Sequence, residues 1–187
     1  MLAACGPALV QSEAGPQFPP RPVGRIGAYV TGPDSLVASF QANIAVEAAR
    51  HGLAAENLTL LFPPTRAYAD AEIRRGLAER SIDSVMIIKI GDARGQRQYA
   101  GTFLQEASAG SSGPTAAAVA SVNGYPSPTT FSARLIDAAT GRKLWEGDGQ
   151  IASGAFSLFA NGTTVADSVA ALFGDLQEKS LIGEPAN

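Results

Sequence analysis

The stretch "SVMIIKI", Ser84 to Ile90, is nearly all apolar and decides how the rest of the chain is interpreted. A run of this length and character is typical of a central strand that is covered on both faces. Upstream, "RIGAYV", Arg25 to Val30, is a second short β-prone run. The turn Gly32-Pro33-Asp34 follows it and places Asp34 to cap a helix. The chain therefore begins its fold with strands that alternate with helices.

Further elements are predicted between these two strands. A helical stripe ends at His51-Gly52, and its members recur every four residues: Leu36, Phe40, Ile44 and Ala48. A second strand is predicted over "LTLLFP", Leu58 to Pro63. A helix of about 15 residues should start near Thr65 or Asp70, and we expect one side to carry Ile73, Leu77 and Arg80. This βαβαβ order predicts a parallel or mixed sheet with helices packed on it.

The second half of the chain has the character of antiparallel sheet. Thr129 to Asp137 alternates apolar and polar residues, and so does "RKLWEGDGQIA" from Arg142 onward. Two alternating runs across a glycine-containing turn predict a hairpin with one buried and one wet face. Residues 99–107 are compatible with a strand, and 115–122 are weakly β-prone. Thr163 to Ser180 predicts an amphipathic terminal helix. The fold class is therefore α/β (α+β): a mixed sheet with a βαβαβ beginning, a C-terminal hairpin and a final helix.

The hairpin "ARLIDAATGRKLWEGDGQ", Ala133 to Gln150, has a strand that ends in Asp137, a turn through Thr140-Gly141 and a returning strand with Trp145. This pattern and the element order resemble a group of bacterial envelope lipoproteins. The group includes the TolB amino-terminal domain, the curli-secretion lipoproteins and the lipoproteins that activate penicillin-binding proteins. The resemblance implies a protein that is not an enzyme and that docks other envelope proteins or oligomerises.

The amino-terminal stretch bears on location. Leu2-Ala3-Ala4-Cys5 resembles the lipobox of bacterial lipoproteins, in which signal peptidase cuts before the cysteine and the cysteine carries the lipid. Gly6 after the cysteine implies sorting to the outer membrane. Residues 6–24 are rich in proline, which favours an extended tether reaching some 50 Å at roughly 3.1 Å per residue. The expected division is a lipobox and tether over 1–24 and one α/β domain over 25–183. The alternative is a terminal thiol without lipid.

Composition excludes several other classes of function. The net charge of −3 is too small to gather nucleic acid or an anionic membrane surface. His51 is the only histidine and sits at a predicted helix end, where a cap role is expected. Asp137 should accept hydrogen bonds from its turn, while Glu146 and Asp148 lie on a wet strand face. Phosphate-loop and nucleophile-elbow motifs are not found in the sequence. We therefore expect no catalysis, no metal and no cofactor.

Two segments are candidates for a partner surface. "GDARGQRQY", Gly91 to Tyr99, holds Arg94, Arg97 and Tyr99, residue types that are enriched at interface hot spots. "GAFSLFANG", Gly154 to Gly162, holds Phe156 and Phe159, which would form a sticky patch if exposed. The alternatives are a solvated loop for the first segment and a segment that closes the core for the second.

The sequence favours a non-catalytic, lipid-anchored accessory protein on the periplasmic side of the outer membrane. Its expected partners are other envelope proteins, and possibly copies of itself. One alternative is a ring- or pore-forming secretion lipoprotein. Another is a ligand-binding or enzymatic domain that uses the ends of the parallel strands, where such sheets usually place their sites.

Overall fold

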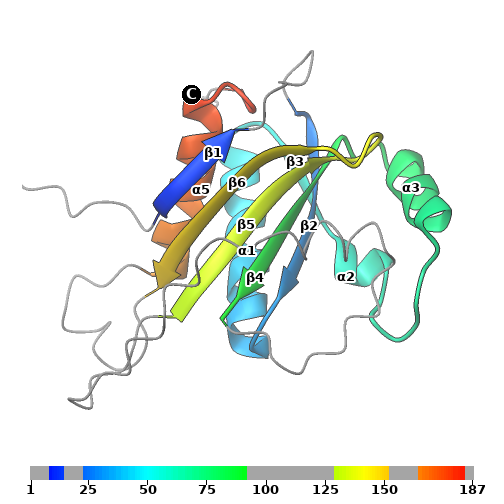
Figure 1. Cartoon of the computed structure of the whole chain (residues 1–187), viewed down its shortest axis with the longest axis horizontal. Helices are drawn as coiled ribbons and strands as arrows, with labels where there is room; N and C mark the ends of the chain where they lie inside the picture. The colour runs from blue at the N-terminus through cyan, green and yellow to red at the C-terminus, as the bar shows by residue number, and fades with distance from the viewer. Residues whose placement is uncertain (1–8, 15–22, 92–128, 152–163, 184–187) are drawn as a thin grey trace, which may run out of the picture.

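The computed structural model describes residues 9–14, 23–91, 129–151 and 164–183. They form a six-stranded sheet in the order β1-β6-β5-β4-β2-β3 (Figure 1). Parallel pairs join three strands, β2 (Arg25–Thr31), β3 (Ala54–Asn57) and β4 (Ser84–Ile90). Antiparallel pairs add β5 (Thr129–Asp137), β6 (Lys143–Ile151) and β1 (Leu9–Ala14). The predicted mixed α/β fold is confirmed.

Strand β4 is central, as the apolar run predicted. It pairs in parallel with β2 on one side and antiparallel with β5 on the other. Its side chains enter two separate hydrophobic clusters, with Met86 and Ile88 in one and Val85 and Ile87 in the other. The alternation of a strand sends successive side chains to opposite faces, so both faces of this strand must be covered by apolar groups.

The larger cluster lies between the sheet and two helices. Helices α1 (Asp34–Arg50) and α5 (Val165–Glu178) lie side by side behind the sheet in Figure 1. Their buried residues pack with the hairpin residue Trp145, and the largest fully buried side chains of this cluster include Trp145, Phe40 and Phe173. Both helices were predicted from their apolar spacing. Asp34, however, is the first residue of α1, and its side chain makes no capping hydrogen bond, because Pro33 occupies the N-cap position.

The smaller cluster covers the opposite face of β2 and β4. It is built from α2 (Leu58–Leu61) and α3 (Asp70–Glu79). The predicted strand over Leu58 to Pro63 is wrong, because Asn57 caps a short helix there by accepting from the Thr59 amide. The strand lies one step earlier, at β3. Helix α3 is also shorter than predicted and ends before Arg80, which is exposed.

The predicted hairpin β5–β6 is confirmed, with β5 at the predicted bounds and β6 starting one residue later, but Arg134 on the face predicted to be solvated is buried. Trp145, Gly147 and Ile151 are buried, while Asp148 and Gln150 are exposed. Asp137 closes the turn by accepting from the backbone amide and the hydroxyl of Thr140, at 2.7 and 2.6 Å. The role predicted for Asp137 is therefore confirmed.

Strand β1 is the element that differs most from expectation. The proline content predicts an extended tether over residues 6–24, yet Leu9–Ala14 pairs with β6 and forms one edge of the sheet. The tether prediction is therefore wrong for these six residues. The backbone groups on one side of these residues pair with the neighbouring strand β6, a long-range contact that local proline content could not reveal.

Candidate functional site

The residues predicted to act lie outside the described part of the chain. They are the lipidation candidate Cys5 and the partner-surface candidates Arg94, Arg97, Tyr99, Phe156 and Phe159. Their roles stay predictions. In the described part of the chain, three sets of polar side chains form hydrogen bonds between strands and helices. These bonds limit the chemistry in which those side chains can take part.

A cluster of four side chains joins β1, β6 and α5, and we call it the Asp175 cluster: Ser12, Trp145, Asp175 and Lys179. The Asp175 carboxylate accepts from Trp145 Nε1 at 2.5 Å, from Ser12 Oγ at 2.9 Å and from Lys179 Nζ at 2.6 Å. Lys179 Nζ also donates to Ser12 Oγ at 3.0 Å. The hairpin pattern indicates Trp145, but no local pattern points to the other three residues, because Ser12 and Asp175 are 163 positions apart.

The electrostatics of this cluster favour the ionised carboxylate. Burial opposes ionisation of Asp175, but the hydrogen bonds from Lys179, Trp145 and Ser12 outweigh it and lower its pKa. Trp145 is fully buried, so its indole N–H needs an acceptor inside the protein. The arrangement therefore fastens the edge strand β1 to the helix layer.

A second set of charges lies on the face of the hairpin turned away from α5. Arg134 donates to Glu146 Oε1 through Nε at 2.8 Å and through Nη2 at 2.6 Å, and Lys143 Nζ donates to Oε2 at 2.7 Å. Burial opposes ionisation of Glu146, but these hydrogen bonds outweigh it and lower its pKa. Burial and the neighbouring Glu146 charge raise the pKa of Asp148. Both oxygens of Glu146 are thus engaged, which favours a structural role for this carboxylate.

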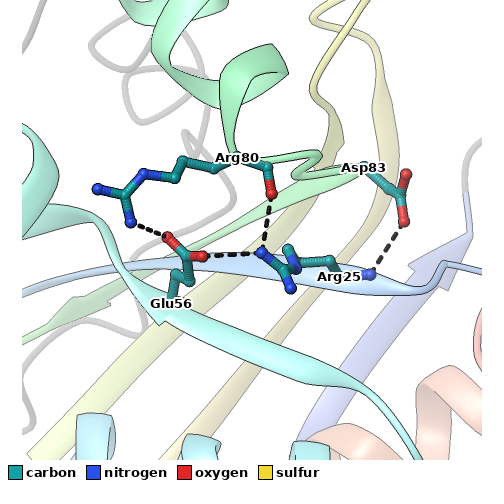
Figure 2. Close-up of polar contacts among 4 residues, drawn as sticks. All are labelled: Arg25, Glu56, Arg80 and Asp83. Carbon is teal, nitrogen blue, oxygen red and sulfur yellow. Dashed lines mark hydrogen bonds and ion pairs between the residues drawn. The ribbon is translucent and has the colours of Figure 1, made fainter.

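A third set, at the amino ends of β2 and β4, is drawn in Figure 2. Glu56 accepts from Arg25 at 3.0 Å and from Arg80 at 3.4 Å, while Arg25 also donates to the Arg80 carbonyl at 2.9 Å. Asp83 accepts from the backbone amides of Gly24 and Arg25, each at 2.9 Å. These contacts join β2, β3 and the end of α3. They lie at the end of the sheet opposite to the one where parallel strands usually place ligand sites.

The carboxyl ends of the parallel strands are closely packed where the structure describes them. Gly32 adopts a φ of +147°, and a Cβ at this position would lie 2.7 Å from the Ile90 Cβ. Nearby, the Gln41 side-chain amide donates to Asn57 Oδ1 at 3.1 Å.

His51 follows α1, stacks on Phe173 at a centroid distance of 5.7 Å and places Nδ1 3.3 Å from the Gly183 carbonyl. The helix-end position predicted for His51 is confirmed.

Within the described ranges, His, Cys, Asp and Glu side chains form no group of three that could hold a metal ion. None of the helices in this part of the chain is long and apolar enough to cross a bilayer.

The chain matches known proteins only at the level of solved structures, and at low sequence identity. Models of protein families give no match to the chain, and curated proteins give none. Among solved structures, the chain is similar to the PelC dodecamer from Paraburkholderia phytofirmans. The identity is 14%, the TM-score is 0.45, and the match covers 87% of this chain and 94% of that one. A PelC variant dodecamer from the same organism gives 12% identity and a TM-score of 0.45 over 87% and 95% of the two chains.

The chain is also similar to lipoprotein GNA1162 from Neisseria meningitidis, with 14% identity, a TM-score of 0.43 and coverage of 86% of this chain and 96% of that one. At these identities the likeness concerns the layout of the fold.

Proposed function

We propose that this protein is a lipid-anchored accessory protein of the bacterial envelope, held by Cys5 on the periplasmic side of the outer membrane and acting through protein–protein contacts without catalysis. The observation that carries the proposal is the Leu2-Ala3-Ala4-Cys5 lipobox followed by Gly6. The structure adds that the polar clusters of the described domain are engaged in joining its strands and helices. Such a domain is suited to positioning and docking.

The place of β1 changes how such an anchor would act. Three residues, Gly6 to Ala8, separate Cys5 from the start of β1 at Leu9. Four extended residue steps span at most about 14 Å, so the lipid-bearing residue lies within about 14 Å of the sheet edge. This is far shorter than the tether expected from the sequence. The anchor would therefore hold the domain against the membrane.

The strand register gives the orientation that follows. Leu9 pairs with Gly149 near the end of β6, and the neighbouring β5 begins at that same end of the sheet. The register of β4 against β5, Ile90 with Phe131, places the carboxyl end of β4 there too. An anchor at Cys5 would turn this end of the sheet toward the bilayer. The Arg25–Glu56–Arg80 end would then face the periplasm.

Membrane fractionation of the native host tests the anchor. The chain should sediment with outer membranes, and Cys5→Ser should release it into the soluble periplasmic fraction. Ala8→Ser is the matched control, since it changes a residue close to the thiol while keeping the thiol, and it should stay with the membrane. Equal distribution of the Cys5→Ser and Ala8→Ser chains would contradict lipid anchoring.

Cross-linking in intact cells tests the accessory role. We expect the wild-type chain to capture at least one envelope protein, and Cys5→Ser to capture less of it, because a lipid anchor raises the effective concentration of partners on the same surface. Repeated captures in which no envelope protein exceeds the background of the Cys5→Ser strain would contradict the accessory role.

A further inference from the structure

Strand β1 contributes little to the hydrophobic core through the side chains that the structure describes. It is an edge strand of the described sheet and pairs with β6 (Figure 1). Of its described side chains, Ser12 and Ala14 are half-buried and Glu13 is exposed. The register of the pair is also interrupted between Leu9 and Gln11. The burial of these three side chains therefore adds little to the attachment of the strand.

The described side-chain bonds between β1 and the helix layer are made by Ser12. Its hydroxyl donates to Asp175 Oδ1 at 2.9 Å and accepts from Lys179 Nζ at 3.0 Å. The bonds of Asp175 with Trp145 and with Lys179 join β6 to α5 and do not involve β1. Loss of β1 would therefore break the two Ser12 bonds and leave the other bonds of the Asp175 cluster in place.

A charge on β1 opposes its pairing with β6. Glu13 is the register partner of Glu146, and residues directly opposite each other on antiparallel strands have side chains on the same face. Asp148 lies two residues further along β6 on that face, and the neighbouring Glu146 charge helps to raise its pKa. Both cations of this face, Arg134 and Lys143, already pair with Glu146. Glu13 therefore brings a third carboxylate to two cations, which weakens the strand pair.

From this balance we infer that β1 is a detachable strand, which leaves β6 while the rest of the domain stays folded and thereby sets the length of the tether at Cys5. The two Ser12 bonds and the backbone pairing favour the docked strand, and the carboxylate of Glu13 favours release. Local opening of this kind requires that few apolar contacts are lost, as the described side chains of β1 indicate.

Release would change both the reach and the attachment point of the tether, a consequence that rests on the proposed anchor at Cys5. With β1 docked, the first paired residue is Leu9, at most about 14 Å from Cys5. With β1 released, the chain is next held at Val23, which is buried and donates its amide to the Leu181 carbonyl at 3.1 Å. Eighteen extended residue steps separate Cys5 from Val23, or about 60 Å at most.

The two attachment points lie at opposite ends of the sheet. Leu9 is at the end where the parallel strands finish, whereas Val23 precedes the first residue of β2, Arg25. The docked strand would therefore hold the domain close to the bilayer in one orientation. The released strand would let the domain reach away from the bilayer and turn its Arg25–Glu56–Arg80 end toward it.

Native-state hydrogen exchange, read by mass spectrometry on the full-length Cys5→Ser chain, tests detachment without any lipid. We expect the slowest amides of β1 to exchange at least about a hundredfold faster than those of β4. Their exchange should also change little at low urea concentrations that accelerate exchange in β4, because the opening of one edge strand exposes little surface. Equal rates and equal urea dependence in β1 and β4 would overturn the inference, since β1 would then open only by global unfolding.

Substitutions in β1 should shift its exchange in opposite directions. Ser12→Ala removes two hydrogen bonds to charged groups and should accelerate exchange in β1 about tenfold. Glu13→Gln removes the opposed charge and should slow it about two- to fivefold. Ser35→Ala is the matched control, since Ser35 is an exposed serine of α1, and it should leave exchange in β1 unchanged. Exchange that Ser12→Ala does not accelerate would contradict the role of the Asp175 cluster as the latch.

A chain with both Ser12→Pro and Glu13→Pro tests whether the domain folds without a docked β1. Successive amides of a strand point to opposite edges, so two adjacent prolines remove one amide that faces β6. We expect this chain to keep a cooperative thermal transition and the far-ultraviolet circular dichroism of a folded α/β domain. Loss of the cooperative transition would overturn the inference, because β1 would then be an integral part of the fold.

Coupling through Cys5, the only cysteine, to a maleimide lipid in a supported phosphatidylcholine bilayer measures the reach of the tether. Neutron reflectometry should place the double-proline chain farther from the bilayer than the wild-type chain. The coupling is chemical, so this result does not depend on lipidation in cells, and a failure of the anchor remains distinguishable from a failure of the detachable strand. Equal separations for the two chains would overturn the inference that β1 sets the tether length.

Discussion

Removing the carboxylate of the Asp175 cluster should destabilise the domain more than its partly exposed position suggests. In Asp175→Ala, the fully buried Trp145 indole loses the acceptor that it contacts at 2.5 Å. An unsatisfied buried donor costs about 1–3 kcal/mol, and the lost pair with Lys179, four residues along the helix, adds about 0.5 kcal/mol. We therefore expect the free energy of unfolding to fall by about 2–3 kcal/mol, which lowers Tm by about 4–12 °C for a chain of this size.

Urea denaturation followed by far-ultraviolet circular dichroism measures this loss. Glu178→Ala is the control on the same helix, since Glu178 is exposed, and it should change the free energy of unfolding by less than about 0.5 kcal/mol. A double-mutant cycle with Trp145→Phe should give a coupling energy of at least about 1 kcal/mol between the two side chains. Circular dichroism is required because Trp145 is the only tryptophan of the chain. An Asp175→Ala loss no larger than that of Glu178→Ala would refute the reasoning.

The same cluster gives a pH dependence whose sign follows from the pKa of Asp175. Its hydrogen bonds lower that pKa in the folded state, so the stabilisation is fully present above the pKa of an unfolded carboxyl, about 3.9. It is lost as the pH falls through the lower folded pKa. The difference in urea midpoint between wild type and Asp175→Ala should therefore shrink below about pH 4. A difference that stays constant from pH 6 to pH 3 would show that the charge of Asp175 is not what stabilises the cluster.

Three further substitutions test the packing, each by urea denaturation. Ser84 Oγ is buried without a hydrogen-bond partner in the described structure, so Ser84→Ala should leave stability unchanged or raise it by up to about 1 kcal/mol, and a clear loss would reveal an unseen bond. A Cβ on Gly27 would lie 2.8 Å from Leu58 Cδ2, so Gly27→Ala should cost about 1–3 kcal/mol; a neutral result would mean that the Leu58 side chain moves freely. Gly174 is inside α5 with no atom within 4 Å of a Cβ, so Gly174→Ala should add about 0.5–1 kcal/mol, and a destabilised variant would contradict the open space found there.

The sequence predicted those strands and helices in which the spacing of apolar residues matches the spacing of the buried positions. The central strand β4, the hairpin β5–β6 and the two helices α1 and α5 all follow from local spacing, because one face of each meets the core. The apolar run that begins at Leu58 is too short to show a period, so its spacing does not distinguish a strand from a helix. A short apolar run fits a strand or a buried helical turn equally well, and here the Asn57 cap selects the helix.

Elements stabilised by distant partners could not be predicted. Strand β3 has the sequence "AAEN", which has low β propensity, and it forms because it pairs with β2. Strand β1 forms because β6 offers an edge and because Ser12 contacts Asp175, a residue on the last helix. Such contacts leave no local signal.

The intact mass of the amino-terminal part of the mature protein, purified from native membranes, distinguishes an anchored chain from a free one. We expect a chain that begins at Cys5, four residues before the start of β1, and that carries additional acyl mass. An unmodified chain that still carries Met1 would contradict the lipid anchor and, with it, the proposed place of this protein in the envelope.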